Sequence, residues 1–402
     1  MKKLILLLTI LLLSNCSFMD EKYEWGAGIS TEIGFPVRIY AGRVGDVSIM
    51  ASFTASFDSP DDGWGVGTQE GSMMKQLPKD IDIVWYSYVE DCFYRVKADL
   101  DYPKLLKLFR EGYKDRARNL EAFPKGYGEE TFRTFVVGLA PGGVVVVWIE
   151  GPMRQIEIGR FQAEKINLKQ PEGLDGHERL IFSKEEHQRV LNDSIARPPH
   201  IREKPIPFGL WDDYRDIKYP WYPTFEFYKG AKIGDVFIEY FNRERWDTFY
   251  DEMTLETPAR KNYSSNEITI IPDIFKHFYN YLHLFLHLLK ILIPDIFYQK
   301  REDISDKKYP LPKTINFIYK ANNGIKYLGE YKFDWEENKK VFAEFFKMYP
   351  NTKRARLNIR VNRDNSLFTI RLENEKGDGI FFPFHRERLD LDDTYDDYPT
   401  LD

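Results

Sequence analysis

Short segments that mix β-branched and aromatic residues recur through the first half of the chain, separated by Gly, Pro and Asp. Clear examples are the segments 35–40, 81–88 and 131–137. Such residues between turn-forming ones are typical of strands. One helix is predicted among them at residues 102–110, because Pro103 stands in its first turn and apolar residues then recur at helical spacing. This pattern predicts a mainly antiparallel β domain over residues 23–250.

The clearest local pattern is the run from Phe135 to Trp148, in which two valine-rich stretches flank Pro141-Gly142-Gly143. Proline and glycine supply the restricted or positive φ angles that a tight turn needs. The uninterrupted valines that follow are typical of a strand that is buried on both faces. We therefore predict a hairpin at the centre of the core, with Gly142 or Gly143 at a positive φ.

The second half of the chain changes in character. Ser183 followed by Glu186 forms a capping box, which predicts a short helix to about Asn192. Residues 251–311 are predicted to be a helical connector, since one long helix there carries a narrow polar stripe on an otherwise apolar surface. The stripe consists of Lys276, Asn280, His283, His287 and Lys290. A helix packed between two domains, or lying in a lipid interface, fits this amphipathic pattern.

Residues 312–388 are predicted to be a separate small α+β unit. Two strands flank the turn at Asn322-Asn323-Gly324, and a helix capped by Asp334, with Glu337 three residues later, follows them. Further strands meet at residues 363–366 and 375–379. The last stretch, residues 389–402, carries six aspartates and is predicted to be a solvated acidic tail. The fold class is thus α+β, with a mainly antiparallel β N-terminal domain, a long amphipathic helix and this small unit.

The first sixteen residues have the pattern of a lipoprotein leader. Met1-Lys2-Lys3 precedes an apolar run from Leu4 to Leu13, and Ser14-Asn15 leads directly to Cys16. The run is too short to cross a bilayer core of about 30 Å as a helix. We expect residues 1–15 to be removed, Cys16 to carry lipid and residues 16–22 to act as a tether. Plain secretory cleavage is the alternative, because Asn15 departs from the small residue usual before a lipidated cysteine.

The net charge of the processed chain and its place in the cell follow from the interpretation of residues 1–16 as a lipoprotein leader. The chain has 57 Lys and Arg against 63 Asp and Glu, and loss of Lys2 and Lys3 leaves a net charge of 55 − 63 = −8. A nucleic-acid-binding surface needs an excess of basic residues, so no nucleic-acid partner is expected. Lipid on Cys16 would attach the protein to a membrane of the cell envelope. Because Ser17 rather than aspartate follows the cysteine, enterobacterial sorting rules favour the outer membrane.

Few residues suggest reaction chemistry. Cys92 lies in a strand-like aromatic run and is interpreted as a small buried hydrophobe without a disulfide partner. His283 and His287 are one helical turn apart, which suits a metal, but no third ligand accompanies them and the polar stripe accounts for both. We therefore predict no catalytic, cofactor-binding or metal-binding residue.

Carboxylates beside aromatic residues raise a second possibility, that of a glycan-binding site. Examples of such carboxylates are Glu90-Asp91, Asp212-Asp213, Glu226 and Glu239. Aromatic faces stack on sugars, and glycoside hydrolysis needs two carboxyl groups that face each other about 5 to 10 Å apart. The candidate ligand platform consists of Trp211, Asp212, Asp213, Trp221 and Tyr222. Packing of the same aromatic residues in the core is the competing interpretation.

The hairpin also carries a family resemblance. Residues 137–148, together with Gln155–Ala163, resemble the family called domain of unknown function 2931, a group of predicted lipoproteins from Gram-negative bacteria. Other segments fit the same pattern, namely 25–30, 36–37, 85–87 and 207–212. The resemblance covers residues 23–241 and transfers no catalytic residue.

The resemblance and the leader together imply an envelope-anchored lipoprotein. We expect a non-enzymatic protein that binds a protein partner in the envelope, and neutralisation of a toxin is one role that suits this anatomy. A glycan-binding protein or glycan hydrolase of the envelope is the alternative.

Overall fold

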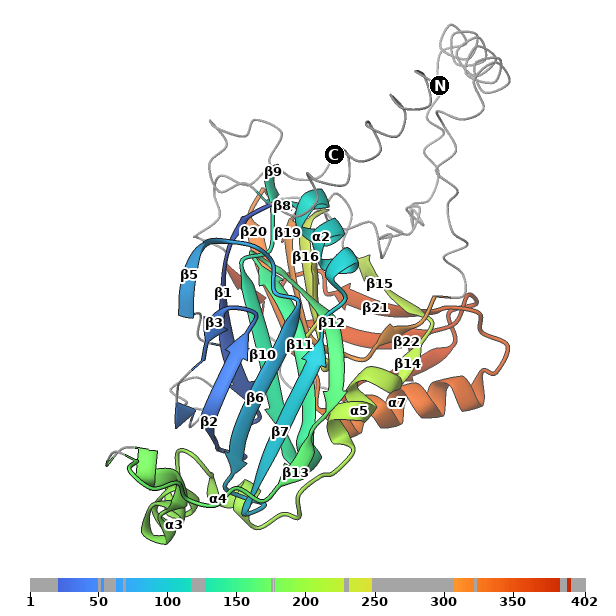
Figure 1. The fold of residues 1–402 in the computed structure, drawn as a ribbon. Helices are drawn as coiled ribbons and strands as arrows, with labels where there is room; N and C mark the ends of the chain where they lie inside the picture. The colour runs from blue at the N-terminus through green and yellow to red at the C-terminus, as the bar shows by residue number, and fades with distance from the viewer. Residues whose placement is uncertain are drawn as a thin grey trace, which may run out of the picture.

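The structure is a computed structural model that consists mostly of strands with few helices (Figure 1). It describes residues 21–49, 52–53, 63–67, 70–116, 127–174, 176, 178–227, 231–247, 307–321, 324–383 and 389–391. Within these ranges the chain forms a large sheet, a second sheet facing it, and a smaller sheet with its own helix.

The large sheet has ten strands. In sheet order these are β24 (Leu389–Leu391), β20 (Lys326–Lys332), β19 (Pro312–Lys320), β16 (Lys232–Tyr240), β17 (Arg245–Asp247), β12 (Arg154–Gln162), β11 (Val144–Gly151), β10 (Thr134–Ala140), β1 (Tyr23–Thr31) and β5 (Glu70–Lys75). Neighbouring strands are antiparallel except β1 and β10, which run parallel with Gly26 opposite Thr134.

A six-stranded sheet packs against one face of the large sheet (Figure 1). Its strands are β13 (Glu164–Ile166), β7 (Cys92–Asp99), β6 (Asp80–Ser87), β2 (Val37–Val44), β3 (Val47–Ser48) and β4 (Ser52–Phe53), the last paired with β2. Ile83 and Trp85 of β6 are buried in the same core cluster as Val145 and Val147 of β11. Burial of these apolar faces is the main force that holds the two sheets together.

A four-stranded sheet, accompanied by helix α7 (Trp335–Met348), packs on another part of the large sheet, where Phe225 contacts Phe317 of β19. Its strands are β15 (Trp221–Glu226), β21 (Ala355–Val361), β22 (Phe368–Glu373) and β23 (Gly379–Phe381). Short pairs are formed by β14 (Lys218–Tyr219) with β18 (Tyr309–Pro310) and by β8 (Tyr113–Arg116) with β9 (Tyr127–Glu130). The remaining elements are the 3₁₀ turns η2 (Pro141–Gly143) and η3 (Glu178–Phe182) and the helices α2 (Tyr102–Glu111), α3 (Lys184–Asn192), α4 (Pro199–Arg202) and α5 (Leu210–Asp216).

The predicted hairpin is confirmed. Strands β10 and β11 pair antiparallel around η2, with Ala140 opposite Val144. Both glycines of the turn have positive φ, 80° at Gly142 and 76° at Gly143. Alternate valines of β11 belong to two different core clusters, so the strand is buried on both faces as its sequence predicted.

The predicted helix caps are confirmed as well. The Ser183 hydroxyl accepts a hydrogen bond from the Glu186 backbone N–H at 3.2 Å, which starts α3. The Asp334 carboxylate accepts one from the Glu337 backbone N–H at 3.0 Å, which starts α7. Side chains that satisfy these first N–H groups fix where each helix begins.

The sheets do not follow the expected division of the chain into units. Strand β15 pairs in parallel with β21, and β16 pairs with β19, so residues 312–388 share two sheets with the first 250 residues. At the start of the expected acidic tail, Leu389–Leu391 form β24 and pair with β20. The long amphipathic helix expected within residues 251–311 lies outside the described residues.

Candidate functional site

A cluster of tryptophans covers the face of β10 and β11 that points away from the six-stranded sheet. Trp64, Trp148 and Trp211 are buried there together with Phe35. The Trp64 and Trp148 rings meet edge to face, with centroids 5.0 Å apart. Gly138 of β10 makes room for this pair, because a Cβ at that position would lie 2.6 Å from Trp148 and 2.7 Å from Trp64.

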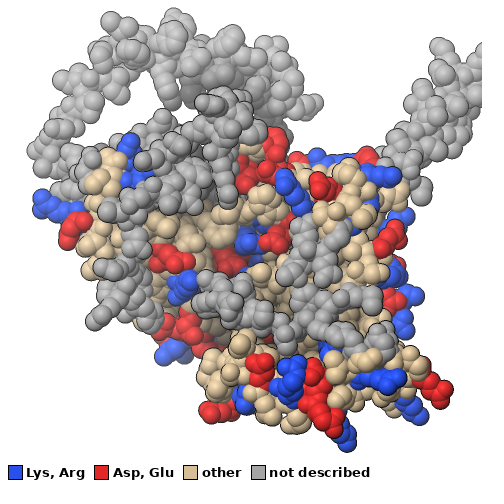
Figure 2. Space-filling model, turned by 90° about the vertical axis from the view of Figure 1, so that its left-hand side faces the viewer, with Lys and Arg blue, Asp and Glu red and all other residues tan. Residues whose placement is uncertain are grey.

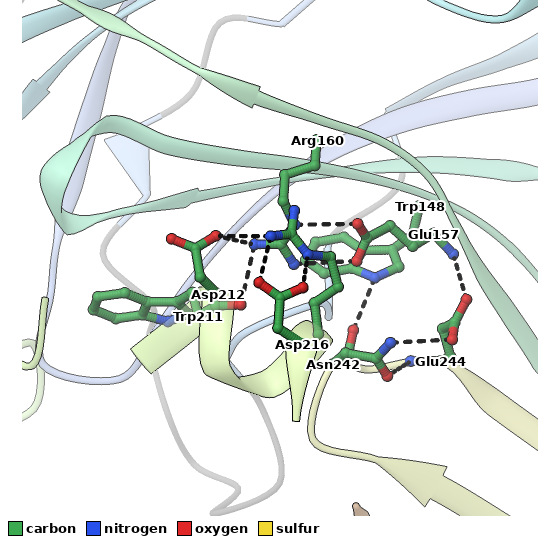
Figure 3. A network of polar contacts seen from close by, with 9 residues as sticks. Trp148, Glu157, Arg160, Trp211, Asp212, Asp216, Asn242 and Glu244 are labelled. Carbon is green, nitrogen blue, oxygen red and sulfur yellow. Dashed lines mark hydrogen bonds and ion pairs between the residues drawn. The ribbon is translucent and has the colours of Figure 1, made fainter. Parts of the chain in front are cut away.

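Arg160 of β12 joins this cluster to helix α5 (Figure 3). Its guanidinium donates to both carboxylate oxygens of Glu157, at 3.1 Å each. It also donates to the Trp211 backbone carbonyl at 3.0 Å and to the Asp212 carboxylate at 3.2 Å. The Arg160 side chain is only 10% exposed, so these charge-assisted bonds form in a partly desolvated site.

Two further ion pairs extend the network along α5. Arg215 pairs with Asp216, and its guanidinium lies 3.8 Å from the Asp212 carboxylate. The Arg215 guanidinium holds the pKa of the Asp216 carboxyl below its usual range. Asp212 is thus shared by Arg215 and Arg160.

The turn between β16 and β17 completes the network from the other side (Figure 3). The Trp148 indole N–H donates to the Asn242 backbone carbonyl at 3.0 Å. The Asn242 amide donates to one oxygen of Glu244, and the Glu157 backbone N–H donates to the other at 3.3 Å. Burial raises the pKa of the Glu244 carboxyl, and the nearby negative charge of Glu157 raises it further.

The network therefore acts as a clamp between α5, β12 and the β16–β17 turn. The carboxylates of Glu157 and Asp212 both face Arg160 and hold it in place. Through these charge-assisted hydrogen bonds Arg160 links α5 to β12.

The five residues of the expected ligand platform are not brought together. Trp211 and Trp221 are fully buried, and they belong to different core clusters. Asp212 takes part in the Arg160 clamp, Asp213 is exposed, and the Tyr222 ring stacks on the Arg354 guanidinium at 4.4 Å. The core-packing interpretation is correct for the two tryptophans, because neither offers an exposed ring face to a sugar.

A second polar centre lies at the turn η2. Its carboxylate, Glu90, is one of those noted beside aromatic residues, but the sequence pattern did not predict its contact with this turn. One carboxylate oxygen of Glu90 accepts hydrogen bonds from the Gly142 backbone N–H at 3.1 Å and from the Tyr94 hydroxyl at 2.7 Å. The other oxygen accepts one from the Ser87 hydroxyl at 3.0 Å. The available signal was the position of Glu90 in the short turn between β6 and β7, where a carboxylate can reach a neighbouring turn.

An exposed phenylalanine covers this turn. The Phe208 side chain is 62% exposed, and its ring lies 3.3 Å from where a Cβ on Gly142 would stand. The Gln162 side chain holds the other side of the turn by donating to the Gly142 carbonyl at 2.6 Å. We call this region, made of Glu90, η2 and residues 206–209, the distal end.

The distal end lies opposite the point where the chain enters the sheet. Because β1 and β10 run parallel, Tyr23 marks the entry end and the turn after Ala140 marks the other end (Figure 1). At the entry end Tyr23 packs on Phe109 of α2, with ring centroids 5.3 Å apart. Helices α3 and α4 lie at the distal end, where basic and acidic side chains are interspersed on the face shown in Figure 2.

Cys92 and the possible metal ligands give little indication of reaction chemistry. Cys92 is a free, partly buried cysteine, and burial raises the pKa of its thiol. Within the described ranges, no group of three His, Cys, Asp or Glu residues is arranged to hold a metal ion. His283, His287 and Cys16 lie outside these ranges. None of the helices that the structure describes is long and apolar enough to span a membrane.

One comparison with known proteins gives a match. Residues 14–209 match the family model described as "Protein of unknown function (DUF2931)". The matched segment contains Cys16, the β10–β11 hairpin and Phe208, and it ends just before α5. No curated protein and no solved structure matches the chain.

Proposed function

We propose that this chain, which carries a DUF2931 segment over residues 14–209, is a lipid-anchored envelope protein that binds a protein partner without catalysing a reaction. Cys16 is the proposed lipid attachment site, and Ser17 after it favours the outer membrane. Neutralisation of a toxin is one role that suits this anatomy.

The exposed Phe208 carries the proposal. Large aromatic side chains are enriched at protein interfaces because they bury a large apolar area with few rotatable bonds. Phe208 is 62% exposed, yet its own turn is closed by the Leu210 backbone N–H, which donates to the Pro207 carbonyl at 3.1 Å. Its ring lies against η2, which Glu90 and Gln162 hold through Gly142. A fixed turn loses little conformational entropy on binding, so an aromatic residue on it is suited to anchor a partner.

The direction of the sheet supports the same surface. Seven residue steps separate Cys16 from Tyr23, and an extended chain of that length reaches at most about 25 Å. Strand β1 carries the chain from Tyr23 to Thr31, and β10 runs parallel to it towards η2. A lipid on Cys16 would therefore hold the entry end near the membrane and direct the distal end away from it.

The glycan alternative has less support. It depended on aromatic faces beside carboxylates, and the two tryptophans of that set are fully buried. Of its three remaining members, Asp212 and Tyr222 face Arg160 and Arg354 respectively, and Asp213 is exposed.

The test is recovery of a partner from envelopes by the intact lipoprotein after mild crosslinking. We expect the wild-type protein to retain a specific partner protein and Phe208→Asp to lose it. Phe381→Asp is the matched control, because Phe381 is 60% exposed on β23 in a different sheet. Failure to recover any specific partner, or equal recovery by both variants, would contradict the proposal.

A further inference from the structure

Two arginines lie close together where α3 leads into α4. Arg202, the last residue of α4, donates through one terminal nitrogen to the backbone carbonyls of Asn192 and Arg197, at 3.1 Å each. These bonds fix the Arg202 guanidinium against the C-terminal end of α3. Arg197 lies between the two helices, and its pKa is lowered by burial and by the positive charge of Arg202.

Neither arginine is neutralised by a carboxylate of the described part of the chain. The Nε atoms of both are buried and make no hydrogen bond. Two other arginines do have carboxylate partners, since the partly buried Arg160 pairs with Glu157 and the more deeply buried Arg243 pairs with Glu239. A pair of like charges that is partly removed from water is costly unless an anion approaches it.

The backbone around the two arginines is held in place. The Asp193 side chain accepts hydrogen bonds from the backbone N–H groups of Ile195 and Ala196, at 2.8 and 3.3 Å. Helix α4 is seated on the turn at Gly34, where a Cβ would lie 2.6 Å from the Ile201 side chain. The guanidinium groups are therefore presented by a fixed backbone.

We propose that Arg197 and Arg202 bind a carboxylate from an acidic segment of the protein partner. The proposal rests on the proposed function and names the partner chemistry that the distal end recognises. Arginine presents planar donors that match a carboxylate. Ile195, two residues from Arg197, is 57% exposed, and Phe208 lies six residues after Arg202. A protein segment uses apolar and anionic contacts together, whereas a small inorganic anion has no use for the apolar side chains.

Titration of the full-length lipoprotein in detergent with labelled hexaglutamate tests this site. We expect the wild-type protein to bind the peptide and Arg197→Gln to weaken binding at least tenfold. Arg189→Gln is the matched control, because it removes one positive charge from α3 where Arg189 is exposed and pairs with Glu186. It should change the affinity less than twofold. An absence of binding by the wild type, or an equal loss in both variants, would overturn the proposal.

Two further measurements distinguish the proposed carboxylate site from a simple oxyanion site and from a structural role of Arg197. Inorganic phosphate should compete only weakly, and displacement of the peptide at low phosphate concentration would show a simple oxyanion site instead. The melting temperature of Arg197→Gln should equal or exceed that of the wild type, since an unpaired charge is removed, and a large decrease would show a structural role instead. If Phe208→Asp loses the partner but the wild-type protein binds no hexaglutamate, this inference is wrong. The proposed function still holds in that case.

Discussion

The backbone N–H of Gly142 donates to the carboxylate of Glu90 at 3.1 Å, although 52 residues separate them. Glu90 follows a strand of the six-stranded sheet, and Gly142 belongs to the turn of the ten-stranded sheet. The same carboxylate also accepts from the hydroxyls of Tyr94 and Ser87. One side chain thus ties the two sheets together at the distal end, and burial with the Glu90 hydrogen bond raises the pKa of Tyr94.

Removal of this carboxylate should destabilise the protein. Glu90→Ala leaves three donors without their acceptor, and hydrogen bonds to a charged group contribute about 1.5 to 3 kcal/mol each at most. We expect the free energy of unfolding to fall by about 2 kcal/mol, measured by urea denaturation. Glu111→Ala is the control, because Glu111 is 60% exposed on α2. A decrease no larger than that of the control would show that the carboxylate does not join the sheets.

Substitution of Gly143 should be more damaging than substitution of a glycine with the same backbone conformation in open space. A Cβ on Gly143 would lie 2.8 Å from Tyr94 and 3.0 Å from the Ala163 carbonyl, and its φ is 76°. Gly143→Val should therefore lower the melting temperature strongly. Gly173→Ala, at φ 80° with no atom nearby, should show only the backbone cost of about 1 to 2 kcal/mol. Equal melting temperatures for the two variants would mean that the turn is not packed.

The hairpin and the helix caps could be predicted because their signals are local. Pro141-Gly142-Gly143 between valine runs sets the turn, and Ser183 and Asp334 mark helix starts within three residues of their partners. The need for glycine at position 138 could not be predicted from a local pattern. It depends on Trp64 and Trp148, which meet only after folding.

Non-local relationships were the ones that sequence patterns missed. Burial of Trp211 and Trp221 depends on which elements cover them, so the sequence left both a ligand platform and core packing open for these residues. The pairing of β15 with β21 joins residues more than a hundred positions apart, and no local pattern indicates it. The hydrogen bond of Glu90 is non-local as well, because its partner Gly142 belongs to another sheet.

The stability of the protein should respond to pH through Glu244. Its pKa is raised above the ordinary value of 4.5, so the folded state holds this proton more tightly than the unfolded chain. The resulting contribution to stability is complete below pH 4.5 and is lost as the pH rises through the folded-state pKa. Glu244→Gln removes this dependence, so the melting temperature of the variant relative to wild type should increase from pH 4 to pH 8. A constant difference across this range, like that expected for Glu111→Gln, would contradict the assignment.

Anchoring is tested through Cys16. Cys16→Ser removes the only thiol that the leader offers for lipid attachment, so incorporation of labelled palmitate should be abolished and the protein should leave the membrane fraction. Cys92→Ser is the control and should retain the label. Equal incorporation by wild type and Cys16→Ser would show that the protein is not a lipoprotein of this kind.

Photo-crosslinking in intact cells tests directly whether the distal end binds a protein partner. A photoreactive amino acid is placed at position 208 in one strain and at position 381 in another, and adducts are detected with an antibody to the lipoprotein. We expect a discrete adduct of defined mass from position 208 that is absent from position 381. No adduct from position 208, or the same adducts from both positions, would contradict this expectation.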